Sequence, residues 1–430
     1  MPHPTRDRLL GHPDFRHLLF GAAASQAGSQ VTLVALPLVA VLELHATAFQ
    51  VGLLTAAETA AFVLVGLPAG AWLDRTRRLP VLIRADVVRF LAVGSIPLAA
   101  LAGVLTMAQL YLVALVTGVA TVFFDVAHQS FLPNLLPREH LVAGNGALET
   151  VRASAQVVGP GAGGGLVQLL GAPLAIVADA AGYLASAVLL RRIRSQEDEP
   201  PPSPGRSLHA DVAEGVRFVL GHPLLRVIAA ATAVSNLFAA VLMAVQTVFW
   251  VRVLELSPGA IGILLSVSAV GGLAGALCAG RLATRLGQAR LIWLSALVSA
   301  PFALLWPLSA GPAAPVLFAV GSAVVLFGAV VYNVAQVSFR QALCPPELLG
   351  RMNATMRFLV WGTLPLGALL GGTIAETAGP RAALWVCALG FLAVPVPLLL
   401  SPIRRSRDLP TSSSDPAPGP DPAPAGTGTH

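Results

Sequence analysis

One acidic residue stands deep inside a long apolar stretch, where an ionisable side chain is costly to bury and usually serves a function. Glu58 lies ten residues into the stretch 48–72, about 15 Å along a helix that rises 1.5 Å per residue. A carboxyl group at that depth can bind and release a proton as its solvation changes. We predict that Glu58 carries a proton. The alternative is a permanently neutral carboxyl that is hydrogen-bonded to a neighbouring helix.

A second acid, Asp125, shares one helical face with His128 and Gln129, because these residues follow at i+3 and i+4. Two roles are open for Asp125: it carries a proton, or it pairs with Arg152 or Arg89 to close a gate. Other acids in apolar sequence have neighbours that suggest structure. The expected i, i+3 ion pairs are Asp86 with Arg89 and Glu149 with Arg152, and the expected interface residues are Asp179 and Glu376.

Neutral amides form a further polar set at membrane depth. Gln26 and Gln30 lie at i and i+4 on one helical face, and amides near an aromatic ring suit a large, partly apolar solute. Bonding between helices is the alternative reading. The predicted cavity residues are Gln26, Gln30, Asn236, Asn333, Gln336 and Trp361.

The elements that position these residues must be membrane helices. The 430 residues are 55% hydrophobic and only 11% charged, with a mean hydropathy of +0.75, whereas soluble domains carry about a quarter charged residues. All 27 basic residues are Arg, which excludes a Walker-type phosphate loop and Schiff-base chemistry. No nucleophile with its base and no cluster of metal ligands is present, so we expect neither an enzyme nor a cofactor nor a bound metal.

Hydropathy predicts an all-α integral membrane protein with twelve transmembrane helices. The net charge of +6 comes from arginines in every alternate loop, which places both termini on the cytoplasmic side of the cell membrane and argues against nucleic-acid binding. The predicted spans are 18–42, 48–72, 80–104, 108–131, 145–169, 173–190, 225–250, 259–280, 290–308, 315–338, 355–378 and 382–401.

The second half of the chain repeats the first. LGHPDFR at 10–16 returns as LGHPLLR at 220–226, a shift of 210, and 125–145 returns at 333–353 with nine identities in twenty-one columns. Copies separated by an even number of spans share their orientation, so the architecture is two parallel six-helix repeats with a site between them. The predicted organisation is a cytoplasmic N-terminal segment 1–17, a bundle 18–194, a cytoplasmic linker with a surface helix 195–223, a second bundle 224–402 and a disordered cytoplasmic tail 403–430.

The loop between the second and third spans carries a recognisable motif. GAWLDRTRR at 70–78 resembles the GxxxDRxGRR signature of the major facilitator superfamily, with Arg77 at the usual glycine position. The resemblance implies a gating role for this loop, in which a glycine permits close helix contact and the aspartate pairs with arginines. A basic loop that serves topology alone is the alternative. The implied gating residues are Gly70, Asp74, Arg75 and Arg78.

The fifth span contains GPGAGG at 159–164, which resembles the antiporter motif GPxxGG of exporters in this superfamily. Glycines allow close helix packing, and a proline removes one backbone hydrogen bond. The resemblance favours export, whereas a plain packing kink is the alternative. The motif residues are Gly159, Pro160, Gly163 and Gly164.

A closer resemblance extends from about residue 10 to 405. SQAGSQVTLVALPLVAV and FFDVAHQSFLPNLLPREHLVAGNGALE are similar to the enterobactin-exporter and macrolide-efflux branch of the superfamily. This implies a proton-driven antiporter that exports a small amphipathic molecule by alternating access, although Ser29 stands where relatives often carry an acid. Uptake of a metabolite by the same fold is the alternative, and a membrane enzyme or receptor is a weaker one. One chain already encloses the proposed path, so we expect a monomer.

Overall fold

The computed structural model describes residues 11–73, 76–137, 140–195, 197, 208–344 and 348–405, and all regular secondary structure in these ranges is helical. The predicted N-terminal segment and C-terminal tail fall mostly outside them. The first half comprises α2 (Pro13–Leu38) with the π-helical turn η1 (Val39–Glu43), α3 (Ala48–Leu73), α4 (Arg78–Leu101), α5 (Met107–Leu135), α6 (Leu141–Leu170), α7 (Ala172–Ala175) and α8 (Val177–Arg191).

The second half begins with α9 (Leu208–Gly221) and repeats the same order of long helices. It comprises α10 (Pro223–Arg252), α11 (Pro258–Leu286), α12 (Gln288–Ser299) with η3 (Ala300–Leu304) and α13 (Leu305–Leu308), α14 (Ala314–Leu343), α15 (Leu349–Trp361), α16 (Thr363–Ala378), α17 (Pro380–Ala393), α18 (Pro395–Leu399) and η5 (Pro402–Arg405).

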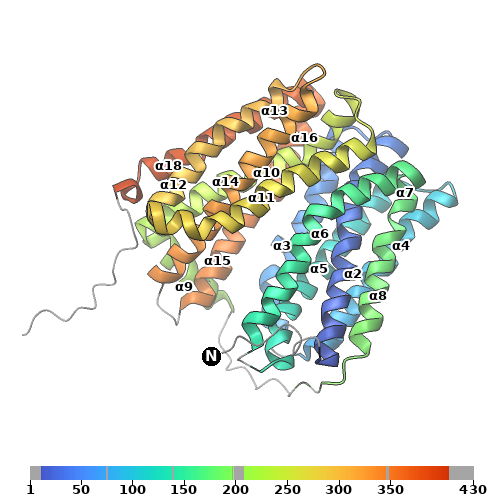
Figure 1. Ribbon diagram of the computed structural model, residues 1–430, viewed down its shortest axis with the longest axis horizontal. Helices are drawn as coiled ribbons and strands as arrows, with labels where there is room; N and C mark the ends of the chain where they lie inside the picture. The colour runs from blue at the N-terminus through green and yellow to red at the C-terminus, as the bar shows by residue number, and fades with distance from the viewer. Residues whose placement is uncertain are drawn as a thin grey trace, which may run out of the picture.

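The all-α membrane fold is confirmed. Within the described ranges, ten helices or continuous helical runs are long and apolar enough to cross a membrane. The remaining two long helices, α4 and α6, are 24 and 30 residues long. The charges of Arg84, Asp86 and Arg89 lower the hydropathy of α4, and a run of glycines lowers that of α6. Both helices nevertheless pack within the first-half bundle (Figure 1).

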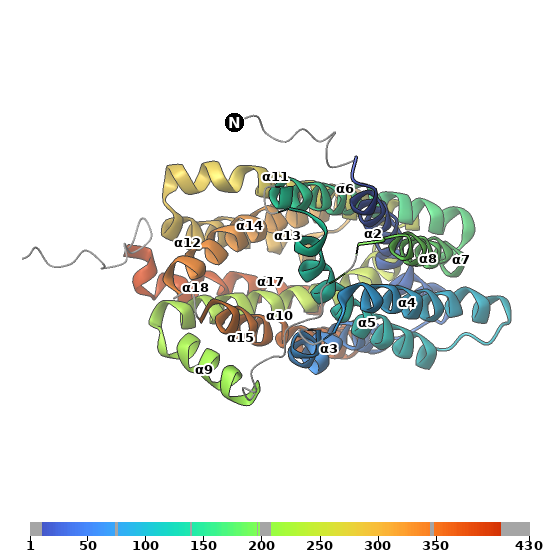
Figure 2. The same cartoon turned by 90° about the horizontal axis from the view of Figure 1, so that it is seen from below.

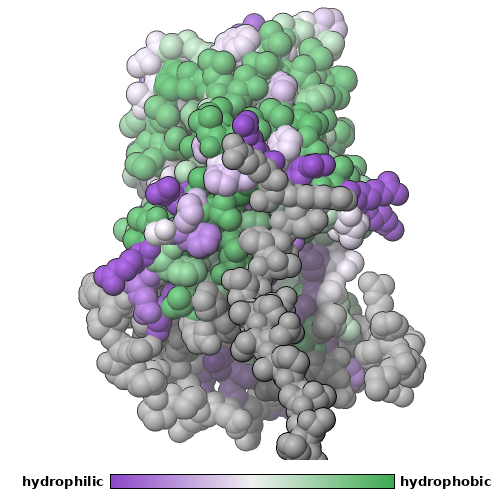
Figure 3. Space-filling model, turned by 90° about the vertical axis from the view of Figure 1, so that its left-hand side faces the viewer, coloured by the Kyte–Doolittle hydropathy of each residue, from purple (hydrophilic) through white to green (hydrophobic). Residues whose placement is uncertain are grey.

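The helices form two bundles, one from each half of the chain (Figures 1 and 2). We call the end that holds the start of α2 and the surface helix α9 the proximal end, and the opposite end the distal end. The helix α9 lies against α15, where Glu214 and Arg351 form an ion pair of 2.5 Å. Hydrophobic residues cover the upper, distal part of the face in Figure 3, and hydrophilic residues gather below it. Such an apolar surface suits a lipid environment.

The repeat in the sequence reappears in the local geometry. His12 and His222 cap α2 and α10, each accepting a hydrogen bond from a backbone N–H, at 3.4 and 3.3 Å, and a proline follows each histidine. After these helices the chain turns through His45 and Glu255, which adopt left-handed φ angles of 50° and 51°. Positions related by the shift of 210 thus share uncommon backbone conformations.

The two halves meet at the distal end through paired glycines. A Cβ atom on Gly164 of α6 would lie 2.8 Å from the Cα of Gly262 of α11, and one on Gly52 of α3 would lie 2.8 Å from the Cα of Gly372 of α16. Both distances are shorter than real Cβ contacts allow, so the backbones touch directly. Because the repeat relates Gly52 to Gly262 and Gly164 to Gly372, the two crossings are equivalent.

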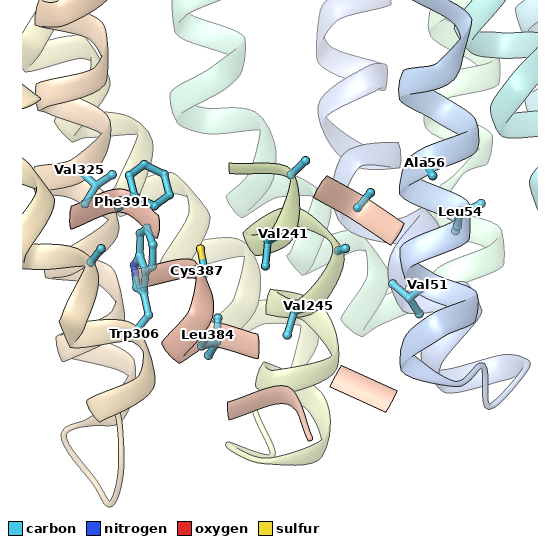
Figure 4. Close-up of a cluster of buried hydrophobic side chains, with 14 of the residues drawn as sticks. Val51, Leu54, Ala56, Val241, Val245, Trp306, Val325, Leu384, Cys387 and Phe391 are labelled. Carbon is cyan, nitrogen blue, oxygen red and sulfur yellow. The ribbon is translucent and has the colours of Figure 1, made fainter. Parts of the chain in front are cut away.

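The core of the second half is apolar and aromatic. Figure 4 shows Trp306, Phe391 and Cys387 together in this core, and the rings of Trp306 and Phe391 meet edge-on with centroids 5.4 Å apart. All three side chains are buried. The second bundle is therefore held by ordinary hydrophobic packing.

Candidate functional site

The first half encloses a polar cavity of about 340 Å³ between α2, α3, α4, α5 and α8. Four of the predicted site residues line it: Glu58, Asp125, Gln26 and Gln30. Residues that are far apart in the sequence thus line one cavity, as expected where the helices of a bundle pack around a common centre.

The two predicted proton-carrying acids differ in their surroundings. The side chain of Glu58 is exposed to the cavity near the middle of α3, and that of Asp125 is half-buried on α5. Neither carboxyl forms a hydrogen bond or ion pair with a residue in the described ranges. Arg89 binds Asp86, and Arg152 binds Glu149, so both predicted i, i+3 pairs are confirmed. Within the described ranges, Asp125 therefore forms no ion pair with either Arg89 or Arg152.

The back wall of the cavity, where α4, α8 and α2 meet, is charged. Asp86 and Arg89 form a buried ion pair, with exposed side-chain fractions of 0% and 4%. The guanidinium of Arg89 stacks between two rings, 4.1 Å from the centroid of Phe124 and 4.4 Å from that of Tyr183. Asp179 completes this wall at 1% exposure. This wall therefore contains several ionisable groups at membrane depth, where burying a charge is energetically unfavourable.

Hydroxyl groups connect Asp179 to its neighbours. The hydroxyl of Ser29 lies 3.4 Å from Oδ1 of Asp179 and 3.0 Å from the hydroxyl of Tyr183. Among the described residues, the other carboxylate oxygen of Asp179 and the hydroxyl of Thr32 are buried without a hydrogen-bond partner. Asp179 therefore lines the cavity, and it also lies between helices, as the sequence suggested.

A second cavity, of about 270 Å³, lies between the halves and shares Phe62 with the first. The ring of Phe62 on α3 meets that of Trp361 on α15 with centroids 4.4 Å apart. Arg357 lies over both rings, with its guanidinium carbon 5.6 and 4.9 Å from the centroids. The predicted cavity residue Trp361 thus lines this aromatic compartment, together with Arg357, which the sequence reasoning did not single out.

The three remaining amides lie elsewhere. Asn236 donates to the backbone oxygen of Val360 at 3.2 Å, and Gln336 donates to the side chain of Asn333 at 2.9 Å. None of these amides lines either of the two cavities. They make the helix-bonding contacts that formed the alternative reading, and a role in binding solute stays a prediction.

The loop motif is only partly described. Gly70 lies within the last two turns of α3 and Arg78 begins α4, whereas Asp74 and Arg75 lie outside the described ranges. The structure does explain why Arg77 can replace the usual glycine. Arg77 is extended, at φ −65° and ψ 131°, whereas its repeat counterpart Gly287 has φ +88°, a conformation that favours glycine.

The glycines of the fifth-span motif face two different helices. Gly159 lies directly against the side chain of Gln30, and a Cβ atom on Gly163 would lie 3.0 Å from the Cα of Val31. Gly164 makes the distal crossing with α11, and the carbonyl of Pro160 contacts the same helix. The motif thus packs α6 against both the cavity-lining helix α2 and the opposite half of the molecule.

The second half has a counterpart of the first cavity that is nearly closed, at about 30 Å³. Its lining includes Ser235, Ala296, Ser299, Tyr332 and Phe391. At shifts of 210 and 208, these positions match Ser25, Asp86, Arg89, Phe124 and Tyr183 of the first half. The same fold therefore builds a cavity with charged lining residues in one bundle and a nearly closed cavity with uncharged lining residues in the other.

The sequence contained a signal for the charged back wall. Asp179 stands in an apolar stretch as Glu58 does, and the stretch returns at a shift of 208 with Cys387 in place of the acid and Phe391 in place of Tyr183. A residue that breaks the repeat by adding a buried charge is a candidate for function. A comparison of the two repeats for such differences identifies Asp179 and Arg89 as candidate functional residues.

Comparisons with known proteins agree on the family. The family model described as Major Facilitator Superfamily matches residues 18–362 and 229–426. The multidrug efflux pump Tap of Mycolicibacterium fortuitum is 27% identical over 398 residues, covering 89% of this chain and 92% of that protein. The enterobactin exporter EntS of Citrobacter koseri is 28% identical over 414 residues, covering 94% and 95%.

Solved structures show the same fold. A bacterial homologue of the iron transporter ferroportin in an inward-facing state superposes with a TM-score of 0.75 at 17% identity, covering 92% of this chain and 99% of that one. A mutant of the nucleoside transporter NupG gives 0.74 at 14% identity, covering 90% and 99%.

Proposed function

Since the chain belongs to the major facilitator superfamily, and is therefore a multi-pass membrane transporter of a small-molecule substrate and not an enzyme, we propose that it is a proton-driven antiporter. Its cargo is a small amphipathic molecule such as a drug, a macrolide or a siderophore, exported across the cytoplasmic membrane. The printed names of its relatives, a multidrug efflux pump and an enterobactin exporter, support this direction. Those names describe the relatives, and for this chain we propose only the chemical class of the cargo.

One observation carries the proposal. The cavity in the first half holds two carboxyls, Glu58 and Asp125, that pair with none of the described residues, beside the amides Gln26 and Gln30, and it adjoins the aromatic compartment at Phe62. Amides and aromatic rings suit an amphipathic solute, and a carboxyl at membrane depth suits a proton. Antiport requires that the binding of substrate and the binding of a proton influence each other, and here the carboxyls and the aromatic rings line two adjoining cavities that share Phe62.

The distribution of arginines supports an orientation of the protein in the membrane. The basic loops favour a cytoplasmic proximal end with both termini on that side. In that orientation the glycine crossings seal the outer end, and the cavity of this state serves the cytoplasm. Glu58 would take a proton from outside after the halves rock and release it inside when substrate binds. A single chain suffices for this path, so the proposal includes a monomeric transporter.

The test uses everted membrane vesicles with an imposed proton gradient. A panel of siderophores, macrolides and lipophilic cations is scored for uptake into the vesicles and for substrate-evoked proton release. Proton release with one class of compound, together with accumulation inside the everted vesicles, is the expected result and defines the cargo. Accumulation in right-side-out vesicles instead would establish proton-coupled uptake and overturn export. The control is the same vesicle preparation carrying Glu58→Gln.

A further inference from the structure

We infer that Asp179 is a second proton-binding residue of the transport cycle, separate from Glu58 and Asp125. The inference rests on the proposed proton-driven antiport and adds a site behind the substrate space, at the back wall formed by α2, α4 and α8. The charged or titratable groups that face Asp179 are Asp86 and Arg89 from α4 and Tyr183 from its own helix, while α2 contributes the hydroxyls of Ser29 and Thr32.

The first argument is the balance of charge in the back wall. Two carboxyls, Asp86 and Asp179, face one guanidinium, Arg89, and all three side chains are at most 4% exposed. An uncompensated charge in such a place is strongly unfavourable. One bound proton makes the set neutral, so a proton is the ligand that this wall requires.

The second argument decides which carboxyl binds the proton. Asp86 already forms the ion pair with Arg89. Asp179 has no ion-pair partner among the described residues and receives the long hydrogen bond from Ser29, at 3.4 Å. One oxygen of each carboxyl is buried without a hydrogen-bond partner in the described ranges, so the ion pair is what distinguishes the two: the charge of Asp86 is compensated by a contacting cation and that of Asp179 is not. Asp179 is therefore the residue that holds the proton in this state.

The repeat supplies an internal control for the packing. The stretch DAAGYLA at 179–185 returns as CALGFLA at 387–393, with four of seven residues identical. Position 387 holds Cys, and the counterparts of Asp86 and Arg89 are Ala296 and Ser299. The second bundle folds with these neutral residues at the same crossing. The three charges of the first half are therefore not needed to build the helix packing, and a functional reason for them is required.

The position of Asp179 connects its charge state to the cavity. It lies at a close crossing of α8 and α2: a Cβ atom on Gly28 would lie 2.6 Å from the Cα of Asp179. The helix α2 carries Gln26 and Gln30 into the cavity. When the carboxylic acid of Asp179 loses its proton to cavity water, the resulting carboxylate needs a cationic partner, and Arg89 lies in the same wall. A new ion pair between Asp179 and Arg89 would shift α8 against the backbone of α2, which lines the cavity.

The first experiment needs no substrate. Infrared difference spectra of the purified protein between neutral and alkaline pH report the C=O stretch of protonated carboxyl groups. We expect Asp179→Asn to remove the contribution of one carboxyl from this band. The matched control Glu149→Gln alters an exposed carboxyl of the same bundle and should leave the band as it is in the unchanged protein. An unaltered band in Asp179→Asn overturns the inference.

The second experiment places Asp179 in the cycle. In everted vesicles with erythromycin and tetraphenylphosphonium as probes, we expect Asp179→Asn and Asp179→Cys to lower gradient-driven accumulation about tenfold or more. Exchange of labelled for unlabelled probe without a gradient should stay within about twofold. The cysteine variant installs the residue that the second bundle already accommodates. Loss of exchange in both variants would assign Asp179 to structure and overturn the inference.

The two proposals fail in different ways. If the unchanged protein moves probe without moving protons, antiport fails and the infrared band still reports whether Asp179 binds a proton. If gradient-driven export is intact in both Asp179 variants, antiport stands and the inference about Asp179 fails.

Discussion

Between α2, α4 and α8 of the first half lies a cavity with an ion pair and a buried acid in its wall, whereas between α10, α12 and α17 of the second half lies a tight core. The backbones agree closely, down to matching helix caps and matching left-handed turns. The side chains do not. Glu58 corresponds to Ser268, Asp125 to Asn333 and Asp179 to Cys387.

This difference separates what the fold needs from what transport needs. A feature present in both halves, such as the paired glycines at the distal end, belongs to the architecture and to the rocking of the halves. A charge present in one half only cannot be explained by architecture. The buried carboxyls of the described ranges, Asp86 and Asp179, lie in the first bundle, whereas the second bundle buries a cation, Arg340. The first bundle is therefore where proton chemistry is expected.

The largest effect is expected from removing the charge of Glu58. Glu58→Gln keeps the size of the side chain but cannot ionise, so proton-coupled transport should fall about a hundredfold or more, while substrate binding is retained. The measurement is substrate-evoked proton release in everted vesicles, with binding followed separately on purified protein. Ser268→Ala changes the counterpart in the second half and should leave transport within about twofold. Full, pH-sensitive transport by Glu58→Gln would remove this residue from the mechanism.

A smaller effect is expected at the distal crossings, where the halves should behave alike. Gly164→Val places a side chain where even a Cβ atom would be 2.8 Å from the Cα of Gly262, so turnover should fall about tenfold because this closed end is disfavoured. Gly52→Val tests the equivalent crossing and should match it. Gly165→Ala is the control, since a Cβ atom there meets nothing within 4 Å. Unequal losses in the two valine variants, measured as turnover per folded molecule, would contradict the symmetry of the seal.

Substitutions in the loop motif should have a smaller effect on turnover, and this effect should again be confined to the first half. Asp74→Asn is expected to slow turnover on the order of fivefold, with little change in substrate affinity, because it alters the proposed gating loop and leaves the cavity residues unchanged. Its counterpart in the second half is Thr284, whose hydroxyl donates to the backbone oxygen of Arg281 at 2.9 Å. Thr284→Val should leave turnover unchanged. Initial rates over a range of substrate concentrations separate turnover from affinity, and an unchanged rate in Asp74→Asn would leave topology as the only role of the loop.

The smallest effect compares the two versions of the same loop glycine. Gly287→Ala forces a side chain into φ +88° and should lower the free energy of unfolding by about 1 kcal/mol. Arg77→Ala introduces no backbone strain, because this position is extended, and should lower the free energy of unfolding by less than Gly287→Ala does. Thermal unfolding in detergent provides the measurement. A larger loss for Arg77→Ala would show that its side chain, and not its backbone, shapes the loop.

The sequence predicted the fold well because its signals were local and repeated. Hydropathy located the spans to within a few residues, and helices such as α5 extend beyond the predicted apolar span because their ends continue outside the expected membrane core. The motif at 159–164 indicated close packing, and its glycines do contact other helices. These features depend on short stretches of chain, which a sequence displays directly.

The site was only partly predictable, because periodicity gives the face of a helix but not what that face meets. Gln26 lines the cavity and Asn236 bonds to Val360, although the repeat shift of 210 relates these two polar residues to each other. The role of Arg89 depends on rings contributed by α5 and α8. Such a wall is assembled from tertiary contacts, and only a comparison of the two repeats could have indicated it from sequence.

The glycine crossings at the distal end have an energetic consequence. They join the halves through backbone surfaces in dispersion contact, with hydrogen bonds beside them such as Gly161 N–H to Ser266 Oγ at 2.9 Å and Gly259 N–H to Gln168 Oε1 at 3.0 Å. Alternating access requires that these contacts break in each cycle, so the closed and open arrangements must lie within a few kcal/mol of each other. A nearly balanced equilibrium of this kind responds to modest differences in ligand affinity between its two states. The binding of a single proton or a weakly held solute is then enough to reverse which arrangement predominates.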